Sequence, residues 1–297
     1  MGLKTLFSIR FKVENFDTTV SVIIPTLNRS ALLPRALRSV LSQTRPADEV
    51  IVVDNGSTDG TLQMLSEKFP EVKVFSEPKK GVSASRNLGI ALARYNWIAF
   101  LDSDDEWHQN KLDTQMRAHL RYEGYRLSHT DEIWVKEGKR INQHNKHKKK
   151  GGYIFENCLK LCCISPSSVL INRNIFRELG GFDDTLPACE DYDMWLRVTS
   201  REPVLFVSEP LTIKYGGHSD QLSKYYWGMD RFRVRALEKL LALSDLNEEQ
   251  TRVTQIMLMK KLNILFAGAT KRGNQSLLKV CERKLEYWEK YIQENQN

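Results

Sequence analysis

The sequence predicts an α/β protein with a mainly parallel central sheet and a helical C-terminal region. Short β-branched runs alternate with helical apolar spacing from residue 20 to residue 101, and beyond about residue 225 the spacing is helical. Strands that alternate with helices of roughly 10 to 15 residues form right-handed βαβ units, and helices then cover both faces of the sheet. We therefore expect ligands at the carboxyl ends of the strands.

The first strand is predicted over Val20 to Pro25, and apolar residues at spacings of three and four predict a helix over 33–41. The same alternation then repeats along the chain. Further strands are predicted over Val50 to Val53, Val72 to Phe75 and Trp97 to Leu101, and further helices over Leu62 to Phe69 and through Leu88 to Leu92.

After Tyr125 the pattern becomes irregular, with a polar basic loop over 136–152 and then short elements up to Tyr215. We interpret residues 1–223 as one domain, with halves at about 20–105 and 106–223, and residues 224–297 as a helical region. The stretch 256–266 is apolar on several faces. Burial against the core is favoured there, with a dimer contact or a peripheral membrane contact as alternatives.

Composition restricts the class of protein. The chain has 297 residues, of which 41% are hydrophobic and 27% charged, which excludes a disordered or fibrous protein. No apolar run approaches the roughly 18 to 20 residues that cross a bilayer, and we expect no signal peptide. The five cysteines lack zinc-site spacing, which indicates a reduced, cytoplasmic chain. Cys158 and Cys162 are spaced to share a helical face, where packing as buried free thiols is favoured over metal ligation by thiolates.

Two acidic segments follow predicted strands. Asp102-Ser103-Asp104-Asp105 comes directly after the fourth strand, and carboxylates placed there can hold a divalent cation that bridges nucleotide phosphates. The alternative is that these acids cap a helix beginning near Gln109. The turn from Asp54 to Thr61 follows the second strand and contains Asn-Gly and Asp-Gly pairs, so a plain turn competes with a binding role for the carboxylate.

These segments carry a resemblance to a known family. Together with 22–29 (VIIPTLNR), 81–87 (GVSASRN) and 190–193 (EDYD), they resemble, in order and spacing, the motifs of the family-2 glycosyltransferases. The resemblance covers about Val20 to Arg197. It implies a GT-A-like αβα sandwich with a nucleotide-binding half and an acceptor half, followed here by the C-terminal helical extension.

The resemblance also implies site residues. Pro25, Thr26 and Asn28 would line the nucleotide pocket, Asp54 would meet the base, and Arg86 would lie near the diphosphate or the base. Asp102 would contact the ribose with Ser103 beside it, and Asp104 would ligate Mn²⁺ or Mg²⁺. Asp105 is the alternative ligand, because Asp104 and Asp105 form an adjacent pair.

The family's general base matches Asp191, since an inverting transfer needs one carboxylate to take the acceptor proton. Glu190 would orient the acceptor or cap the helix, and Trp195 would support that helix. His218 lies in a Gly-rich segment where some family members carry a metal-binding or diphosphate-binding histidine, although a plain loop residue is favoured. The basic run 144–150 is interpreted as a solvated loop, or as a contact to phosphate on a lipid-linked acceptor or an anionic bilayer.

The predicted function is therefore transfer of one sugar, with inversion, from a nucleoside-diphosphate sugar to an acceptor hydroxyl of a glycan or lipid-linked acceptor. UDP is the expected nucleotide, and surface glycan assembly is the expected setting. The alternatives are a sugar nucleotidyltransferase and a non-catalytic nucleotide-sugar-binding or scaffold protein. The net charge of +7 also permits nucleic acid, but the basic run lacks interleaved aromatics, so none is expected. A homo-oligomer and a peripheral position on the inner face of the membrane remain open.

Overall fold

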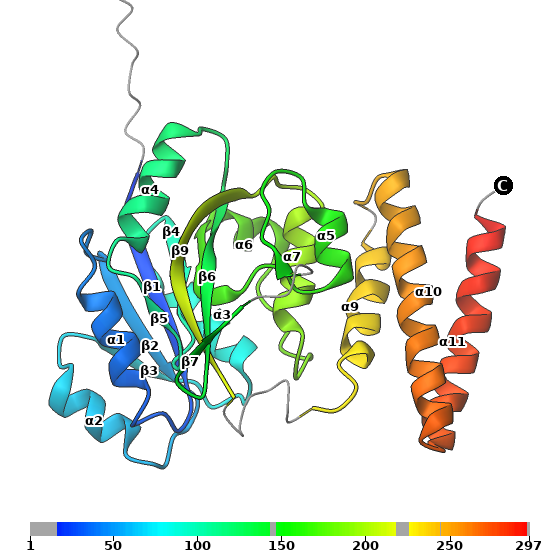
Figure 1. Cartoon of the computed structure of the whole chain (residues 1–297), viewed down its shortest axis with the longest axis horizontal. Helices are drawn as coiled ribbons and strands as arrows, with labels where there is room; N and C mark the ends of the chain where they lie inside the picture. Colours follow the sequence, from blue (N-terminus) through cyan, green and yellow to red (C-terminus); the bar gives the residue numbers. More distant parts are fainter. Residues whose placement is uncertain (1–16, 143–146, 218–225, 244, 296–297) are drawn as a thin grey trace, which may run out of the picture.

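Nine strands form one sheet through the middle of the protein (Figure 1). This computed structural model describes residues 17–142, 147–217, 226–243 and 245–295, and all nine strands lie within them. Their order is β3-β2-β1-β4-β8-β6-β9-β5, with β7 paired to β6. The strands are β1 (Val20–Thr26), β2 (Glu49–Asp54), β3 (Lys73–Ser76), β4 (Trp97–Phe100), β5 (Glu106–Trp107), β6 (Leu127–Lys136), β7 (Lys139–Ile141), β8 (Val169–Asn172) and β9 (Leu205–Gly216).

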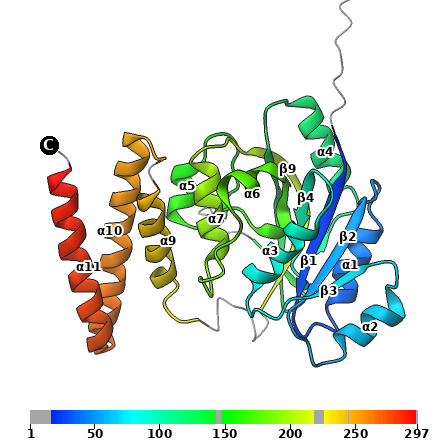
Figure 2. The same ribbon diagram turned by 180° about the vertical axis from the view of Figure 1, so that it is seen from behind.

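Helices cover both faces of this sheet (Figures 1 and 2). They are α1 (Leu33–Leu41), α2 (Thr61–Lys68), α3 (Val82–Leu92), α4 (Lys111–Arg121), α5 (Phe155–Lys160), α6 (Asn174–Leu179), α7 (Glu190–Thr199), α9 (Asp230–Ala242), α10 (Glu248–Lys271) and α11 (Gln275–Glu294), with a 3-10 turn η2 at Pro166–Ser168. The predicted α/β class, with its αβα layers and C-terminal helices, is confirmed.

Alternation along β1 divides the core into two clusters. Val22 and Ile24 pack with α1, α2 and α4. Ile23 points to the other face of the sheet and packs in the cluster that contains α3, α5, α6 and α7. Near Ile23 there is no room for a side chain on α3, since a Cβ at Gly89 would lie 2.4 Å from Ile23 Cγ2. Glycine there lets α3 lie close against the sheet.

The strand directions bring the ends of four strands to one edge. β1 pairs in parallel with β2 and β4, and β4 and β6 both run antiparallel to β8, so β1, β2, β4 and β6 end on the same side. Thr26 lies opposite Asp54 in the β1–β2 register. The sequence segments 26–29, 54–61 and 102–105 therefore follow strands that end at the same edge.

β6 is the main difference from the sequence-based expectation, because it is a ten-residue strand where an irregular segment was predicted. Its polar residues are buried and paired. Ser128 Oγ accepts one hydrogen bond of 2.9 Å from Gln115 Nε2 and lies 2.9 Å from His119 Nε2. The hydroxyl of Thr130 lies 3.0 Å from that of Thr212. Because these buried positions of β6 are polar, the sequence lacks the alternation of apolar and polar residues that indicates a strand.

The C-terminal helices α9, α10 and α11 lie side by side at the end of the molecule farthest from α2 (Figure 1). Their apolar core is continuous with the cluster that holds α7, and it extends to Trp288 on α11. Leu258, Leu262 and Leu265 of α10 are buried as expected, whereas Ile256 and Ile264 are 54% and 48% exposed. The boundary at 223/224, and any dimer or membrane contact, stay predictions. Among the described residues, no helix combines the length and the apolar character needed to cross a bilayer.

Candidate active site

The acidic segment 102–105 forms a turn between β4 and β5, closed by a hydrogen bond of 3.0 Å from Asp105 N–H to Asp102 O. It does not cap α4, which begins at Lys111 after Asn110. Ser167 on η2 ties the turn down: its hydroxyl accepts from Asp102 N–H at 3.1 Å and donates to Asp105 at 2.6 Å. Ser103 is buried in the same turn.

Asp104 and Asp105 differ in what surrounds their carboxylates. Both oxygens of Asp105 accept hydrogen bonds, from Ser167 and from Tyr215 N–H (3.1 Å), and burial raises the pKa of Asp105 to about 8 although Lys214 opposes this. Burial and the neighbouring Asp102 charge raise the pKa of Asp104. The geometry therefore favours Asp104 over Asp105 as the residue available to a cation.

At the ends of β1 and β2, two buried oxygens face no partner. Thr26 Oγ1 and Asp54 Oδ1 are buried, and among the described residues neither atom makes a hydrogen bond. Asp54 Oδ2 instead accepts the N–H groups of Gly56 and Ser57, both at 3.0 Å. Unpaired buried oxygens are costly, and a ligand donor at this place would satisfy them.

Asn28 fixes the loop next to these oxygens. Its backbone is left-handed, with φ at 54°, its N–H donates to Ser57 Oγ at 2.8 Å, and its side-chain oxygen accepts Thr58 N–H at 2.8 Å. Pro25 precedes Thr26 in β1. The predicted nucleotide residues of β1 and of the 54–61 turn therefore lie together, and the turn combines structural bonds with one unpaired carboxylate oxygen.

Arg86 on α3 connects the two halves of the site. Its guanidinium is almost fully buried and donates to Asp102 Oδ1 at 2.8 Å and to Glu190 Oε1 at 2.7 Å. Burial opposes ionisation of Asp102, but the charges of Arg86 and Lys214 prevail and lower its pKa. Burial and the Asp191 charge raise the pKa of Glu190 to about 7 against the effect of Arg86.

Asp191 lies in the first turn of α7, partly exposed beside buried Glu190. Its Oδ1 accepts Tyr192 N–H at 2.7 Å, and Cys162 Sγ is 3.1 Å from its Oδ2. The helix begins after Cys189, which has a left-handed backbone with φ at 63°. The carboxylate is thus held from two sides at the start of a helix.

No local sequence pattern indicates the contact between Cys162 and Asp191. α5 ends at Lys160, so Cys162 follows the helix instead of sharing its face, and that expectation was wrong. Cys158 is buried on α5, and its sulfur lies 3.1 Å from that of Cys163. No spacing rule links a cysteine to a carboxylate 29 positions later, so only the fold reveals the contact.

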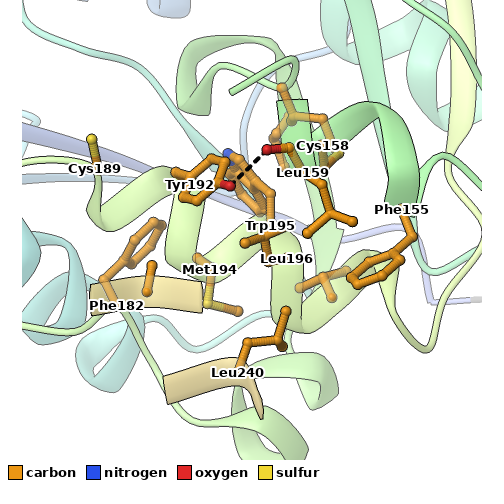
Figure 3. Packing of buried hydrophobic residues seen from close by; sticks show 14 of the residues in the cluster. Phe155, Cys158, Leu159, Phe182, Cys189, Tyr192, Met194, Trp195, Leu196 and Leu240 are labelled. Atoms are coloured by element: carbon orange, nitrogen blue, oxygen red, sulfur yellow. Dashed lines mark hydrogen bonds between the residues drawn. The ribbon is translucent and has the colours of Figure 1, made fainter. Parts of the chain in front are cut away.

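α7 is anchored by its apolar side (Figure 3). Trp195 is buried there, with its ring edge-on to Phe182 at 6.0 Å, and Tyr192 OH donates to Leu159 O at 2.8 Å. Trp195 therefore lies in the core, where it supports the helix. Glu190, which faces Arg86, connects the same helix to the acidic turn.

Lys214 on β9 is a second feature that sequence patterns did not indicate. Burial lowers the pKa of Lys214, but the acidic groups Asp105, Glu132, Asp102 and Asp191 together outweigh burial and raise it. One cation thus interacts with the acidic turn and with the predicted base. His218 lies outside the described residues, as do 144–146 of the basic run, so their predicted roles stay predictions. In the described part of that run, Lys149 is buried and paired with Glu132, so the expectation of a solvated loop was wrong for Lys149.

Asp102 and Asp104 form an oxygen donor set suited to a divalent cation. Two nearby carboxylates, one of them with a raised pKa, repel each other, and a hard cation between them relieves that repulsion. Within the described ranges, no three His, Cys, Asp or Glu side chains meet as a complete metal site. Mg²⁺ usually takes one or two protein carboxylates and completes its shell with water and substrate phosphates, which fits this pair.

Solved structures share this fold. The 1–349 segment of TarS from S. aureus, in complex with UDP-GlcNAc, superposes with a TM-score of 0.70 at 19% identity and covers 89% of this chain and 79% of that one. A mannosyltransferase from Pyrobaculum calidifontis, in complex with GDP-Man and Mn²⁺, gives 0.58 at 17% identity over 93% and 86% of the two chains. The architecture is therefore that of GT-A glycosyltransferases.

The chain belongs to glycosyl transferase family 2, whose family model matches residues 21–180. An uncharacterized glycosyltransferase of Rickettsia conorii is 30% identical over 198 residues, which are 66% of this chain and 32% of that protein. An Escherichia coli protein named UDP-Glc:alpha-D-GlcNAc-diphosphoundecaprenol beta-1,3-glucosyltransferase is 30% identical over 190 residues, 61% of this chain and 70% of that one. The chain spans about a third of the length of the relatives from Rickettsia conorii and Rickettsia felis. The predicted family is confirmed.

Proposed function

We propose that the protein transfers one sugar, with inversion, from UDP-sugar to an acceptor hydroxyl, with a divalent cation held by Asp104. Asp102, which we expect at the ribose, supplies a neighbouring carboxylate for the same cation. The observation that carries this is the pair of unpaired buried oxygens of Thr26 and Asp54, at the edge of the sheet where the acidic turn also lies. The imide N–H of uracil would donate a hydrogen bond to Asp54 Oδ1. A thymidine donor would satisfy the same contact.

In the proposed mechanism, some side chains of the site hold others in place, and one carboxylate accepts the proton of the acceptor hydroxyl. The bound cation would supply positive charge to the departing diphosphate. Arg86 holds Asp102 in place through a hydrogen bond of 2.8 Å, and Asp191 is the carboxylate that takes the acceptor proton as the acceptor oxygen attacks. Lys214 adds a positive charge that interacts with both Asp102 and Asp191.

The acceptor class rests on the relatives. The name of the Escherichia coli relative states a lipid-linked sugar acceptor, GlcNAc-diphosphoundecaprenol. We therefore propose a lipid-linked glycan as the acceptor and surface glycan assembly as the setting.

Calorimetric titration of UDP, with and without Mn²⁺, tests the proposal. Wild type should bind UDP more tightly with Mn²⁺, and Asp104→Ala should reduce the affinity to its metal-free value. Asp113→Asn is the matched control, because Asp113 is an acid that pairs with Arg117 on α4. An affinity for UDP that is the same with and without Mn²⁺ would contradict the metal assignment. Metal-dependent UDP binding without sugar transfer to any lipid-linked acceptor would indicate a non-catalytic sugar-nucleotide-binding protein.

A further inference from the structure

A cavity of about 430 Å³ opens on the ribbon formed by β6 and β9, outside the residues assigned to donor and base. Two aromatic rings and several hydrogen-bonding side chains line it. Among the lining residues are Trp134, Phe206, Asp131, Arg140, Asn142 and Lys148. Its volume falls within the roughly 300–1,000 Å³ of small-ligand sites.

An irregularity in the β6–β9 pairing helps to create this hollow. The register shifts between Thr130 and Asp131 and again between Asp131 and Glu132. Ser208, in the part of β9 that has no partner in this ladder, lines the cavity. Bulges of this kind redirect side chains and are common beside functional sites.

The cavity is a neighbour of the active site. β6 ends at the same edge of the sheet as β4, and Trp134 lies opposite Lys214, whose charge interacts with Asp102 and Asp191. On the lining of the cavity, Glu132 and Lys149 form an ion pair of 3.0 Å that is almost fully buried.

The Glu132–Lys149 ion pair is also connected by contacts to Asp191, the predicted base. Lys149 Nζ donates to Cys163 O at 2.8 Å, and the preceding residue, Cys162, contacts Asp191. These contacts connect the cavity lining to Asp191 through the 162–163 segment, so a molecule in the cavity would lie on the acceptor side of the reaction centre.

The chemistry of the lining identifies the class of ligand. Aromatic rings stack on sugar faces, and polar side chains around them bond sugar hydroxyls. Arg140 and Lys148 are exposed at the cavity, and neither makes an ion pair within the described part of the chain, so their charges are available to an anionic group. We infer that the cavity binds an acceptor sugar unit that carries phosphate or carboxylate; this inference rests on the proposed transferase function.

Saturation-transfer NMR on the full chain tests the inference, with UDP and Mn²⁺ present so that the donor site is filled. The probes are N-acetylglucosamine 1-phosphate, glucuronic acid, N-acetylglucosamine and, by phosphorus NMR, inorganic phosphate. Both charged sugars should bind, and the neutral sugar should bind at least about tenfold more weakly, the effect of one lost charge-assisted bond. Trp134→Ala and the double variant Arg140→Gln, Lys148→Gln should each weaken binding of the charged sugars.

Matched controls separate the cavity from the donor site and from folding. Lys139→Gln removes an exposed lysine of β7 that does not line the cavity, and should bind the sugars as wild type does. Trp134→Phe keeps an aromatic ring and should retain binding if Trp134→Ala fails to fold. Binding of inorganic phosphate alone, or sugar binding unchanged in both sets of variants, would overturn the inference. Failure of UDP to bind wild type in the same samples would instead overturn the proposed function.

Discussion

Replacing Arg86 by Met should destabilise the protein and should do so more at pH 8 than at pH 6. The substitution keeps most of the side-chain volume but removes the cation from a buried cluster, where the side chains of Arg86 and Glu190 are only 4% and 7% exposed. Removal of one partner from a buried ion pair costs about 3–5 kcal/mol. Asp102 is 26% exposed and can reach water, so we expect about 3 kcal/mol, mainly from Glu190.

The pH dependence follows from protonation of Glu190. Its pKa is already raised to about 7, and loss of the neighbouring cation raises it further, so the folded variant binds a proton that the unfolded chain has released. Where the folded state binds more protons, stability falls as pH rises, by up to about 1.4 kcal/mol per pH unit for one group. At pH 6 a protonated Glu190 should therefore limit the loss.

Urea unfolding at pH 6 and pH 8 measures both effects as shifts in midpoint at constant m-value. Adding Glu190→Gln to Arg86→Met should recover most of the stability at pH 8, because the second change removes the unpaired charge. A loss below about 1 kcal/mol at both pH values, or no recovery in the double variant, would refute the view of Arg86 as the buried link between the two halves.

Three further predictions concern the site and its surroundings. Cys162→Ala should lower kcat about tenfold with little change in the donor KM, as expected for loss of a hydrogen bond that positions Asp191. Cys162→Ser keeps a donor at this place and should retain much of the wild-type kcat. Equal losses of kcat in both variants would argue against a positioning role. Burial lowers the pKa of both His119 and His129 to about 4, so the unfolded chain binds more protons between about pH 4 and 6.5 and stability should fall across that window on acidification. His119→Gln should flatten the acid side of a plot of unfolding free energy against pH, and an unchanged slope would contradict its buried neutral state. For Asp54→Asn, we expect weaker UDP binding with Mn²⁺ dependence intact, and loss of the metal effect itself would place Asp54 in the metal site.

The nucleotide half was predictable from the sequence because its strands are apolar and its helices amphipathic. β1, β2 and β4 each end within a residue or two of the predicted positions, and the acidic turn follows β4 as expected. The second half was not, because β6 carries buried polar residues whose partners are distant in the chain. A strand of this kind looks like a loop until its neighbours are known.

Site residues followed the same division. Asp54 and Arg86 were expected at the candidate site because their motifs resemble those of the family in order and spacing. Lys214 and Cys162 could not, because each acts through contacts made by the tertiary fold and neither belongs to a local pattern. From the sequence, Asp104 was the expected ligand and Asp105 the alternative, and hydrogen bonds from Ser167 and Tyr215 N–H to Asp105 distinguish the two in the structure.

The buried polar contacts of β6 have a consequence for how uniquely the sheet assembles. A slip of one residue between β6 and its neighbours would turn Ser128 and Thr130 away from Gln115 and Thr212 and leave hydroxyl groups unpaired in an apolar interior. Apolar replacements at these positions would remove that penalty together with the bonds. A more hydrophobic β6 would then tolerate several alignments, and the acidic turn and the base would no longer be held at one fixed separation.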